Sequence, residues 1–498
     1  MEKKQQPNII MIMTDQQRYD TIAELGFEHM DTPNMDKLAQ NGTNFENAFC
    51  PGATCVPSRA AIFTGMHAHN TGVYNLFNSW GHQRTWVNDL ADNGYHCVNI
   101  GKMHVSPTYE DAGFHERVVV ENPQNYLKDK DGRDDEWGRY LSFHNKKRPL
   151  DRQLSDPNWG EKVQGAPWHM EEHLHSDVFI GNSALAWINR HEQTKPVFLQ
   201  IGFTGPHEVY DPLPRHYDKY KDADVPKPIT KEGELDEKPP QQYAHQEYFR
   251  RANGDAQVDI ASATEEDIQH MRRHYYASVT TIDEKLGEIM DALEEQGYLE
   301  NAIVVFTSDH GDMLGDHQLP FKWLMYDSVV HVPLIVWDTR RKNNQTSKEM
   351  TSLIDIGPSL LEEAGVSVPS YFDGHSFMDF VHSKPEHTHR EYVLCEDNYL
   401  TMIRSKDYKL IYYTAQDDSG ELYDLRQDPN ELNNLYNDEN YSDIQTKLQM
   451  KLLKLVLNST YSSSVYKNHG SPKEILWPED NYYLHPITKT NPDGWYMK

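Results

Sequence analysis

The sequence predicts an α/β fold in which a mostly parallel sheet is sandwiched by helices and followed by a smaller C-terminal α+β domain on an antiparallel sheet. Three observations predict it. Short apolar runs recur along most of the chain, and amphipathic stretches of helical length separate them. This alternation is typical of parallel strands that helices cover on both faces. Near residue 391 the pattern changes to closely spaced strand-like segments, which favour a separate antiparallel sheet.

The first predicted strand is Asn8–Met13 (NIIMIM), which ends at Thr14 and Asp15. A continuous apolar run of this length is typical of a strand that is buried on both faces. Four later runs have the same character: Tyr95–Ile100, Pro196–Phe203, Ala302–Thr307 and Val332–Trp337. Functional residues of open parallel sheets lie beyond the carboxyl ends of the strands, so we expect them directly after these runs.

Five amphipathic stretches between these runs are predicted as helices: Thr32–Asn41, Ser58–Thr64, Asp177–His191, Glu265–Gln296 and Ser352–Ala364. Two polar stretches that contain Pro and Trp, Ser106–His175 and Glu208–Ala263, have weak periodicity. They are predicted as long surface loops, which often shape substrate pockets.

The C-terminal segment is predicted to form the second unit, so that the chain divides into residues 1–390 and 391–498. Its predicted strands are Tyr392–Glu396, Leu400–Arg404, Tyr408–Tyr413 and Glu421–Leu425. A helix is expected over Asp443–Leu457. The tail, Ser459–Lys498, is rich in aromatic residues and proline and is expected to pack against the body as extended chain.

Net charge excludes one class of partner. The 498 residues carry a formal net charge of -29 at pH 7. Nucleic-acid binding needs clustered Lys and Arg to neutralise phosphates, so we expect no nucleic-acid partner. An acidic surface also repels anionic ligands at long range. An anionic substrate would therefore need a local group of cations.

The cysteines and the N-terminus indicate in which cellular compartment the protein is expected. The spacing of the four cysteines fits neither a zinc site nor a disulfide framework: Cys50, Cys55, Cys97 and Cys395. The N-terminus shows no signal-peptide core, and no apolar stretch is long enough to span a membrane. We therefore expect no membrane partner and a cytoplasmic location as written, or a periplasmic or secreted one if the start has been trimmed.

Cys55 begins the motif CVPSR, which ends at Arg59 and leads into a helix-like run. A cysteine before a helix start is often only a structural thiol. A helix N-terminus also depresses the pKa of a thiol and makes it reactive. The second interpretation would favour a cysteine hydrolase with His104 or His207 as its base.

Carboxylates follow two of the predicted strands. Asp15 and Gln16 come after the first strand, and Asp309 and His310 come after Ala302–Thr307. Carboxylate and amide oxygens are hard donors that suit Ca²⁺ or Mg²⁺. Each aspartate alone would equally fit a helix cap or a turn. The two together, at the ends of parallel strands, favour a metal site.

Cationic and proton-transferring groups also follow strand ends. Lys102 and His104 lie in GKMH, His207 lies in GPH, and Lys322 lies in the loop after Asp309. A lone histidine or lysine is usually a solvated or packed residue. Several of them beside a pair of carboxylates and an arginine predict a pocket for an oxyanion ester.

These motifs together resemble the type I, formylglycine-dependent sulfatases of the alkaline phosphatase-like superfamily. CVPSR is similar to the C-x-P-S-R signature of that family. The resemblance extends, in the family's order, through DQQR at Asp15, GK-x-H at Lys102, SDHGD at Ser308 and the C-terminal pattern over Tyr408–Leu432. It spans nearly the whole chain and implies an alkaline phosphatase-like fold, with residues 1–390 as the catalytic sulfatase domain.

The resemblance also implies a maturation step and a cofactor. Cys55 would be converted to formylglycine by a formylglycine-generating maturation enzyme, and one Ca²⁺ would be bound, with Mg²⁺ as the alternative. The implied metal ligands are Asp15, Gln16, the modified Cys55, Asp309 and His310. Gln16 and His310 stand where many members have Asp and Asn, and both replacements remove negative charge from the site or its surroundings.

The implied roles divide the remaining residues. Arg59 and Lys102 would hold the formylglycine diol, and His207 or Lys322 would assist the leaving oxygen. His104 would take the proton of the second hydroxyl. The resemblance favours a sulfated carbohydrate, either an algal polysaccharide or a glycosaminoglycan oligosaccharide, as the substrate.

Three alternatives remain open at this point. The first is a phosphonate monoester or phosphodiester hydrolase of the same fold. The second is a non-catalytic carbohydrate-binding relative, against which the intact site residues argue. The third is the cysteine hydrolase, which predicts no metal dependence and inhibition by thiol alkylation.

Overall fold

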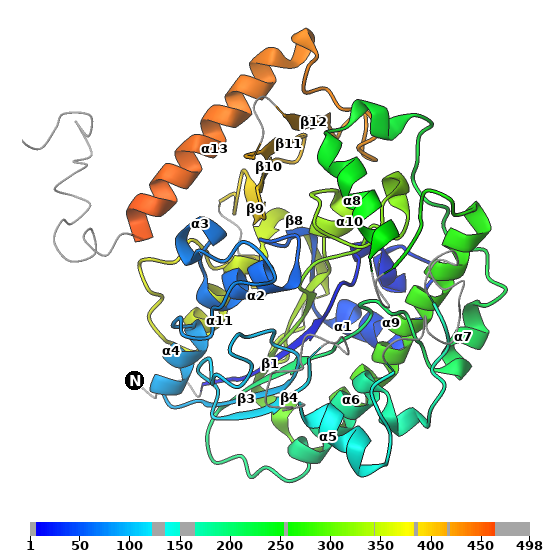
Figure 1. Cartoon of the computed structure of the whole chain (residues 1–498). Coiled ribbons are helices and arrows are strands. Elements are labelled where there is room, and N and C mark those ends of the chain that lie inside the picture. Colours follow the sequence, from blue (N-terminus) through cyan, green and yellow to red (C-terminus); the bar gives the residue numbers. More distant parts are fainter. Residues whose placement is uncertain are drawn as a thin grey trace, which may run out of the picture.

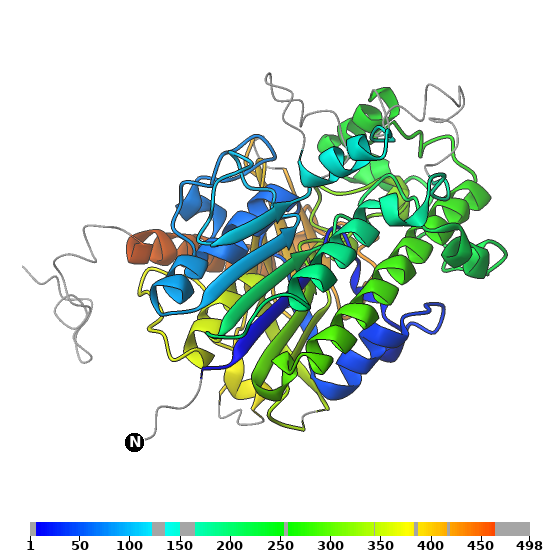
Figure 2. The ribbon, with the colours of Figure 1, turned by 90° about the horizontal axis from the view of Figure 1, so that it is seen from below.

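The computed structural model describes residues 6–121, 135–149, 165–252, 257–342, 344–382, 387–415 and 419–463. Its main sheet has eight strands in the order β4-β3-β5-β1-β6-β7-β2-β8 (Figures 1 and 2). Their bounds are β1 Asn8–Thr14, β2 Thr43–Phe49, β3 His96–Gly101, β4 Glu116–Val119, β5 Val197–Gly202, β6 Ala302–Ser308, β7 Leu334–Asp338 and β8 Gln345–Ser352. The sheet is mostly parallel, as predicted, and β7 runs antiparallel to both β6 and β2.

The central strands end in register. Thr14 of β1 pairs with Ser308 of β6, and Met13 pairs with Gly202 of β5. Gly202 in turn pairs with Gly101 of β3. Four loops that are far apart in the sequence therefore begin at one edge of the sheet.

Helices cover both faces of the main sheet, because the apolar side chains of β1 alternate between two cores. Ile9, Met11 and Met13 pack with α2 (Cys55–Thr64), α4 (Trp86–Asp92) and α11 (Ile356–Glu363). Ile10 and Ile12 pack on the other face with α1 (Pro33–Asn41), α6 (Ser176–Ile188) and α9 (Glu265–Glu295). The predicted sandwich of helices around the sheet is confirmed. Shorter helices are α3 Ala68–Thr71, α10 Asp327–Val330 and α12 Met378–Val381.

A second, antiparallel sheet follows at the C-terminal side. Its strands are β9 Val393–Asp397, β10 Leu400–Arg404, β11 Tyr408–Tyr413 and β12 Gly420–Asp424, each paired with the next in sequence. Helix α13 (Ser442–Ser463) lies along one face of this sheet (Figure 1). Side chains on the other face, such as Met402 and Ile411, join the core of the main sheet. The predicted domain boundary at residue 391 stays a prediction.

Two stretches that the sequence predicted as loops contain regular elements instead. Ser106–His175 includes β4 and α5 (Glu136–Phe143), and Glu208–Ala263 includes α7 (Pro214–Tyr220) and α8 (Pro240–Arg251). These elements are short, and local caps set their starts rather than apolar periodicity. The Asp135 carboxylate accepts a hydrogen bond from the Gly138 amide at the start of α5, and Pro residues begin α7 and α8. Residues 122–134, 150–164 and 253–256 lie outside the described residues.

Three strands of the main sheet were not predicted. β2 (TNFENAF) and β8 (QTSKEMTS) are largely polar, and β4 (ERVV) is only four residues long. β4 and β8 are the edge strands, where one side is open to solvent and an apolar run is not needed. The predicted tail is also wrong at its start, because α13 continues to Ser463; residues 464–498 lie outside the described residues. In the described part of the chain, no helix is long and apolar enough to cross a membrane.

Candidate active site

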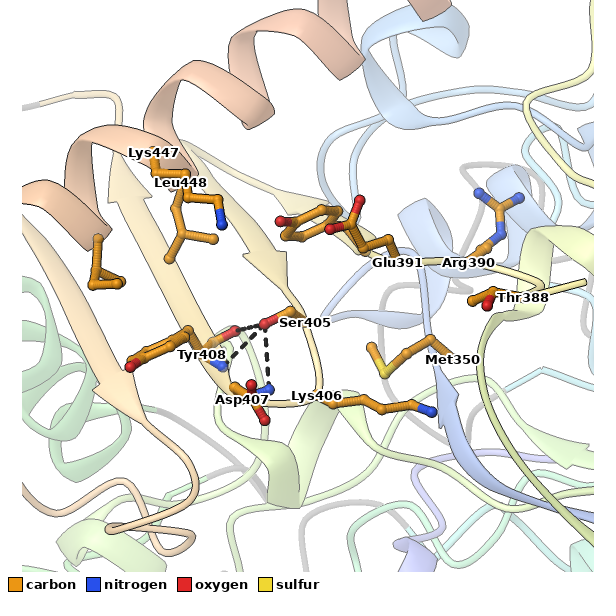
Figure 3. A pocket seen from close by; sticks show the side chains of 12 residues that line it. Met350, Thr388, Arg390, Glu391, Ser405, Lys406, Asp407, Tyr408, Lys447 and Leu448 are labelled. Atoms are coloured by element: carbon orange, nitrogen blue, oxygen red, sulfur yellow. Dashed lines mark hydrogen bonds between the residues drawn. The ribbon is translucent and has the colours of Figure 1, made fainter.

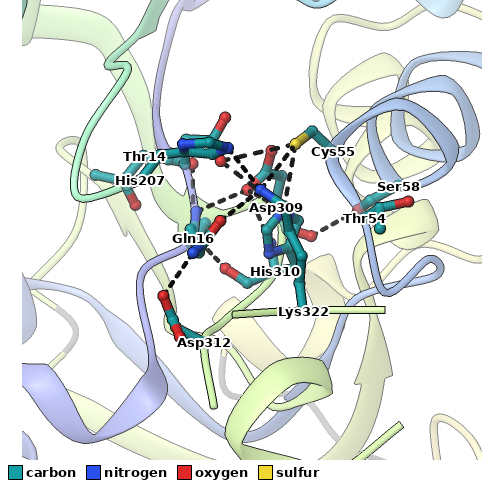
Figure 4. A network of polar contacts seen from close by, with 12 residues as sticks. Thr14, Gln16, Thr54, Cys55, Ser58, His207, Asp309, His310, Asp312 and Lys322 are labelled. Carbon is teal, nitrogen blue, oxygen red and sulfur yellow. Dashed lines mark hydrogen bonds and ion pairs between the residues drawn. The ribbon is translucent and has the colours of Figure 1, made fainter. Parts of the chain in front are cut away.

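The carboxyl ends of β1 and β6 bring the two predicted aspartates together. The Asp309 amide donates to the Thr14 carbonyl over 3.3 Å, and the Gln16 amide donates to Asp309 Oδ1 over 3.0 Å. The Asp15 amide is held by the Gly205 carbonyl, which follows β5. Figure 4 shows Thr14, Gln16, Asp309 and His310 gathered at this edge. Parallel register thus places side chains that are distant in sequence within contact of each other.

Helix α2 brings Cys55 to the same place. Thr54 precedes it in an extended conformation, and Pro57 lies in the first turn, where a missing backbone N–H costs no helical hydrogen bond. The Ser58 hydroxyl donates to the Asp309 carbonyl over 2.6 Å and ties the helix start to the end of β6. The Thr54 hydroxyl donates to Asp397 Oδ2 over 2.7 Å, which ties it to the second sheet.

Four donor atoms form a compact group that suits a metal ion. One atom each from Asp15, Cys55, Asp309 and His310 lies within 4.8 Å of the others, and all four residues are buried. Donors on opposite sides of a Ca²⁺ ion, at about 2.3–2.6 Å each, are about 4.6–5.2 Å apart, so an ion fits between them. In matured enzyme, formylglycine oxygens would take the place of Cys55 Sγ, which lies 3.4 Å from His310 Nε2 and 3.9 Å from Asp15 Oδ1.

The side chain of Gln16 has a different set of contacts. Its amide oxygen accepts a hydrogen bond from Lys322 Nζ over 2.5 Å, and its nitrogen donates to Glu208 over 2.8 Å and to Asp312 over 2.5 Å. The backbone at Gln16 has a φ of 69°, a left-handed conformation that is uncommon outside glycine. These contacts fix the amide beside the donor group, and a ligand role for Gln16 stays a prediction.

Arg59 and Lys102 lie beneath the donor group with no exposed surface. Arg59 Nε donates to Asp309 Oδ2 over 2.7 Å, and its Nη2 lies 3.6 Å from Asp15 Oδ2. Lys102 Nζ pairs with the same Asp15 oxygen, and the Lys102 carbonyl accepts from Arg59 Nη1. Each aspartate therefore has a buried cationic partner.

Lys322 and His207 form the opposite wall. Lys322 Nζ lies 2.6 Å from His207 Nε2 and 3.7 Å from Cys55 Sγ. His207 Nδ1 lies 2.6 Å from the Glu208 carbonyl, which is an acceptor only, so Nδ1 carries the proton. His207 Nε2 then accepts from the Lys322 ammonium. Lys322 is consequently the charged proton donor of this pair.

His104 is the predicted site residue with the most exposed surface, since it is half-buried and the others are buried. Its side chain hydrogen-bonds Cys55, and its backbone amide donates to Glu121 over 2.9 Å. Trp80 Nε1 donates to the His104 carbonyl over 2.9 Å. The least buried side of the site is therefore the side of His104.

The field at this site favours negative charge on residue 55. Burial alone would raise the pKa of the Cys55 thiol, but Lys102, Lys322 and the contacts of His104 and His207 with the sulfur hold that pKa well below its ordinary value. Burial and Cys55 raise the pKa of Asp15, but Lys102 and Arg59 outweigh them and lower it to about 2. A group that develops an oxyanion at this position would be stabilised in the same way.

The negative groups at the site raise the pKa of His310. Burial lowers its pKa, but Asp309 and Cys55 raise it further, to about 10. A protonated His310 supplies the positive charge that the two carboxylates require. A divalent cation among the four donors would supply that charge instead and leave the imidazole neutral, as a ligand must be.

Four neighbours of the site were not predicted: Glu208, Tyr210, Asp312 and Asp397. Asp312 Oδ2 accepts from Tyr210 and Gln16, and burial raises its pKa. Asp312 lies within SDHGD and Glu208 follows His207, so the motifs already quoted contained both. Asp397 ends a predicted strand of the second sheet, and no sequence rule places that sheet beside Cys55. Burial raises the pKa of Asp397 to about 7.

A cavity of 320 Å³ lies elsewhere, between the β10–β11 turn, α13 and the segment before β9 (Figure 3). None of the predicted site residues lines it. Arg390, at its edge, is already paired with Asp355. The chemistry of the molecule is therefore assigned to the strand-end site of Figure 4 and not to this cavity.

Eleven of the side chains described above gather where strands of the main sheet end and helix α2 begins. They supply carboxylates, cations and one activated side chain at the helix start: Asp15, Gln16, Cys55, Arg59, Lys102, His104, His207, Glu208, Asp309, His310 and Lys322. The positive groups face the position where charge would develop on residue 55. The fold and this site define an ester hydrolase built for an oxyanion substrate.

Comparison with known proteins gives the family. The family described as Sulfatase matches residues 7–366, and the family described as N-sulphoglucosamine sulphohydrolase, C-terminal, matches residues 315–458. The chain therefore belongs to the sulfatase family and hydrolyses sulfate esters. The predicted recognition of this family, and of a sulfuric ester hydrolase, is confirmed.

Individual relatives agree with this assignment. The chain is 32% identical to an arylsulfatase of Clostridium perfringens, over 90% of this chain and 94% of the relative. A structure solved in complex with its substrate D-glucosamine-2-N,6-O-disulfate matches with a TM-score of 0.71 and 25% identity, over 92% of this chain and 98% of that one. The phosphonate monoester hydrolase of Agrobacterium radiobacter has the same fold, with a TM-score of 0.77 at 22% identity, over 91% and 96% of the two chains.

Proposed function

We propose that the chain removes sulfate from a sulfated carbohydrate, with Cys55 matured to formylglycine and one Ca²⁺ bound by Asp15, Asp309, His310 and residue 55. The observation that carries this proposal is the convergence of three other metal-type donors and several cations around the single atom Cys55 Sγ. The maturation enzyme is the macromolecular partner that this proposal requires.

Formylglycine supplies a hydrated aldehyde, of which one hydroxyl attacks sulfur and the other allows the aldehyde to re-form as sulfate leaves. A bound Ca²⁺ supplies a hard Lewis acid for the sulfate oxygens. A thiol would instead leave an S-sulfocysteine, an S-alkyl thiosulfate that is awkward to hydrolyse. The rest of the reaction depends on the side chains that the structure describes.

Arg59 and Lys102 hold Asp309 and Asp15 in place, and both cations lower the pKa of Asp15. Burial lowers the pKa of Lys322, but Cys55 and Glu208 raise it further, so that Lys322 is charged. Its Nζ lies 3.7 Å from Cys55 Sγ and is therefore placed to donate a proton to the leaving alcohol. His104, on the open side, is placed to take a proton from residue 55. Removing one such preorganised charge typically costs about 100- to 1,000-fold in rate.

An amino-sugar sulfate is the substrate that we favour. Two findings support it: the substrate named for the solved relative is a sulfated glucosamine, and the C-terminal family is described by N-sulphoglucosamine. A glycosaminoglycan oligosaccharide is the polymer class that presents such sugars.

The decisive experiment has two parts. Mass spectrometry of the peptide that contains residue 55 should show the aldehyde in place of the thiol. Sulfate release should then be measured on glucosamine 6-O-sulfate, glucosamine N-sulfate and an aryl sulfate, and release of the alcohol should be measured on a phosphonate monoester. We expect the highest kcat/KM on a glucosamine sulfate and loss of turnover when the metal is removed by a chelator.

Other outcomes would identify the rivals. A preference for the phosphonate monoester would support the hydrolase whose fold this chain shares. Full activity with an unmodified Cys55, no metal dependence and inhibition by iodoacetamide would support a cysteine hydrolase. Absence of any hydrolysis by matured protein would support a non-catalytic relative.

A further inference from the structure

A second group of metal-type donors lies at the other end of the main sheet. His96 is the first residue of β3, Glu116 is the first residue of β4, and His191 follows the end of α6. One donor atom from each lies within 4.8 Å of the other two. The active site follows the last residue of β3, so the length of the strand separates the two groups.

Neighbouring side chains orient these donors. His96 Nε2 lies 2.7 Å from Glu116 Oε1, and Trp187 Nε1 donates to Glu116 Oε2 over 3.2 Å. The rings of His96 and His191 are nearly parallel, with centroids 5.0 Å apart. Trp187 stacks on His191 at 4.3 Å, and His115 stacks on His96 at 5.2 Å. The imidazoles are therefore held by a row of stacked rings.

We propose that His96, Glu116 and His191 form a surface site for a divalent transition ion of the Zn²⁺ class. Two imidazoles and one carboxylate are the donors that Zn²⁺ prefers, whereas the active site offers more oxygen donors for a harder ion. Donors on a tetrahedral Zn²⁺, each about 2.0–2.2 Å from it, lie about 3.3–3.5 Å apart. Small side-chain rotations reach that spacing, because the His96 and Glu116 side chains are 23% and 51% exposed.

A comparable group in the same chain shows what excludes a metal. Asp338, Glu363 and His382 also present three donor atoms within 4.8 Å. Arg340 pairs with both carboxylates of this group, with nitrogen atoms 2.7 Å from Asp338 and 2.6 Å from Glu363. Among the described residues, no arginine or lysine is paired with Glu116, so the first group keeps its carboxylate for a cation.

The bound ion would join three elements at an edge of the molecule. β4 is an edge strand, paired only with β3, and α6 packs on that face of the sheet. An ion that binds the folded chain and not the unfolded one raises the stability of the folded state. The bound ion would therefore hold β3, β4 and the end of α6 together and stabilise this edge of the sheet.

The test uses the matured enzyme with Ca²⁺ present in excess, so that its active site is filled. Equilibrium dialysis against Zn²⁺ should show one more bound ion per chain in wild type than in His96→Gln/His191→Gln. His382→Gln, which alters the group blocked by Arg340, should bind as much Zn²⁺ as wild type. Zn²⁺ should raise the Tm of wild type and of His382→Gln but not that of the double variant.

Trp187 provides a local readout. Ni²⁺ bound at His191 should quench the Trp187 fluorescence, and Trp187→Phe should abolish that part of the quenching while retaining the bound ion. Glu116→Gln, a milder change, should weaken Zn²⁺ binding by about 10-fold or more. All variants should keep the sulfatase kcat/KM of wild type, since the group lies far from Cys55. Equal Zn²⁺ stoichiometry in wild type and the folded double variant, or in wild type and Glu116→Gln at every concentration, would overturn the proposal.

Discussion

The two sheets bring distant residues together in different ways. In the main sheet, β1 and β6 are neighbours although Gln16 and Asp309, which follow them, are 293 positions apart. In the second sheet each strand pairs only with its neighbours in sequence, so it gathers no distant residues by itself. It acts on the active site through contacts with loops: Asp397 holds Thr54, and Lys409 holds the loop after Lys322.

This difference separates two kinds of contribution. The ends of the main-sheet strands and helix α2 carry the groups that we propose to react, and the second sheet fixes segments beside them. Substitutions at the first should change rate with little change in the free energy of unfolding. Substitutions at the second should change that free energy first and rate only as a consequence. The following predictions test this division, beginning with the largest effect.

Cys55→Ala should lower kcat/KM by about 10⁴-fold or more, because it removes the group that attacks the substrate. The thermal unfolding curve should stay close to that of wild type, since the smaller side chain leaves the helix start and its contacts in place. Steady-state kinetics and calorimetry measure the two quantities. Cys97→Ala, a buried cysteine away from the site, is the matched control and should retain turnover. A folded Cys55→Ala variant with substantial activity would remove residue 55 from the mechanism.

Lys409→Met should lower the free energy of unfolding by about 3–5 kcal/mol. The Lys409 side chain is fully buried, its Nζ lies 2.5 Å from both Asp327 and Glu431, and it donates to the Met325 carbonyl. Its loss leaves the buried Glu431 carboxylate and the partly buried Asp327 carboxylate with one fewer cation. Denaturant titration measures the change, and Lys406→Met, on the exposed turn beside it, should be nearly neutral. Equal stability of the two variants would show that the second sheet does not support the loop.

The pairing of Asp355 with His389 and Arg390 connects the two sheets, and we expect its contribution to stability to be lost at acidic pH. Burial raises the pKa of Asp355, but Arg390 and His389, directly before β9, lower it far below its ordinary value of 3.8. A lowered folded-state pKa contributes stability above pH 3.8, and this contribution is lost as the pH falls below it. The free energy of unfolding should therefore fall there by up to about 1.4 kcal/mol per pH unit from this group.

Asp355→Asn should remove that part of the pH dependence and be less stable than wild type at pH 7. Denaturant titrations between pH 5 and the lowest pH at which the chain stays folded would measure it. A variant with an unchanged acid slope would show that the pairing of Asp355 with His389 and Arg390 does not couple the sheets.

Thr54→Val should have the smallest effect, about 1 kcal/mol in the free energy of unfolding, since one buried hydrogen bond to Asp397 is lost. A double-mutant cycle with Asp397→Asn should recover a coupling energy of similar size. The kcat of Thr54→Val should fall only modestly. If Thr54→Val and Asp397→Asn act additively, the second sheet does not position the start of α2.

Much of the fold could be predicted because the central strands can be recognised from the apolar character of their own residues. β1 and β6 are nearly continuous apolar runs, β3 and β5 are mostly apolar, and the two layers of helices bury all four. β2 and β8 carry no such signal, since their polar side chains meet solvent or other polar groups and only pairing makes them strands. The excursions that hold α5, α7 and α8 were missed for a similar reason, because caps and tertiary contacts define those short helices.

Prediction of the site from the sequence has the same limit, because tertiary contacts place some of its residues. Residues that follow apolar runs, such as Asp15, Lys102 and Asp309, could be expected at one edge of the sheet from the strand rule alone. The separate contacts of Gln16, by contrast, depend on Glu208 and Asp312, whose side-chain positions are tertiary. Asp397 could not be placed at all, because an antiparallel sheet built from local pairs has no rule for where it docks.

The near-complete enclosure of Cys55, with 1% of its surface exposed, has a consequence for biosynthesis. A small sulfate group can reach this atom, but the catalytic machinery of another protein cannot be brought to it once α2 is seated between β6 and the second sheet. For the maturation that we propose, oxidation of the thiol would have to precede completion of folding. Polypeptide made in a host without the proposed oxidising enzyme should then fold but lack activity, and later addition of that enzyme should not restore it.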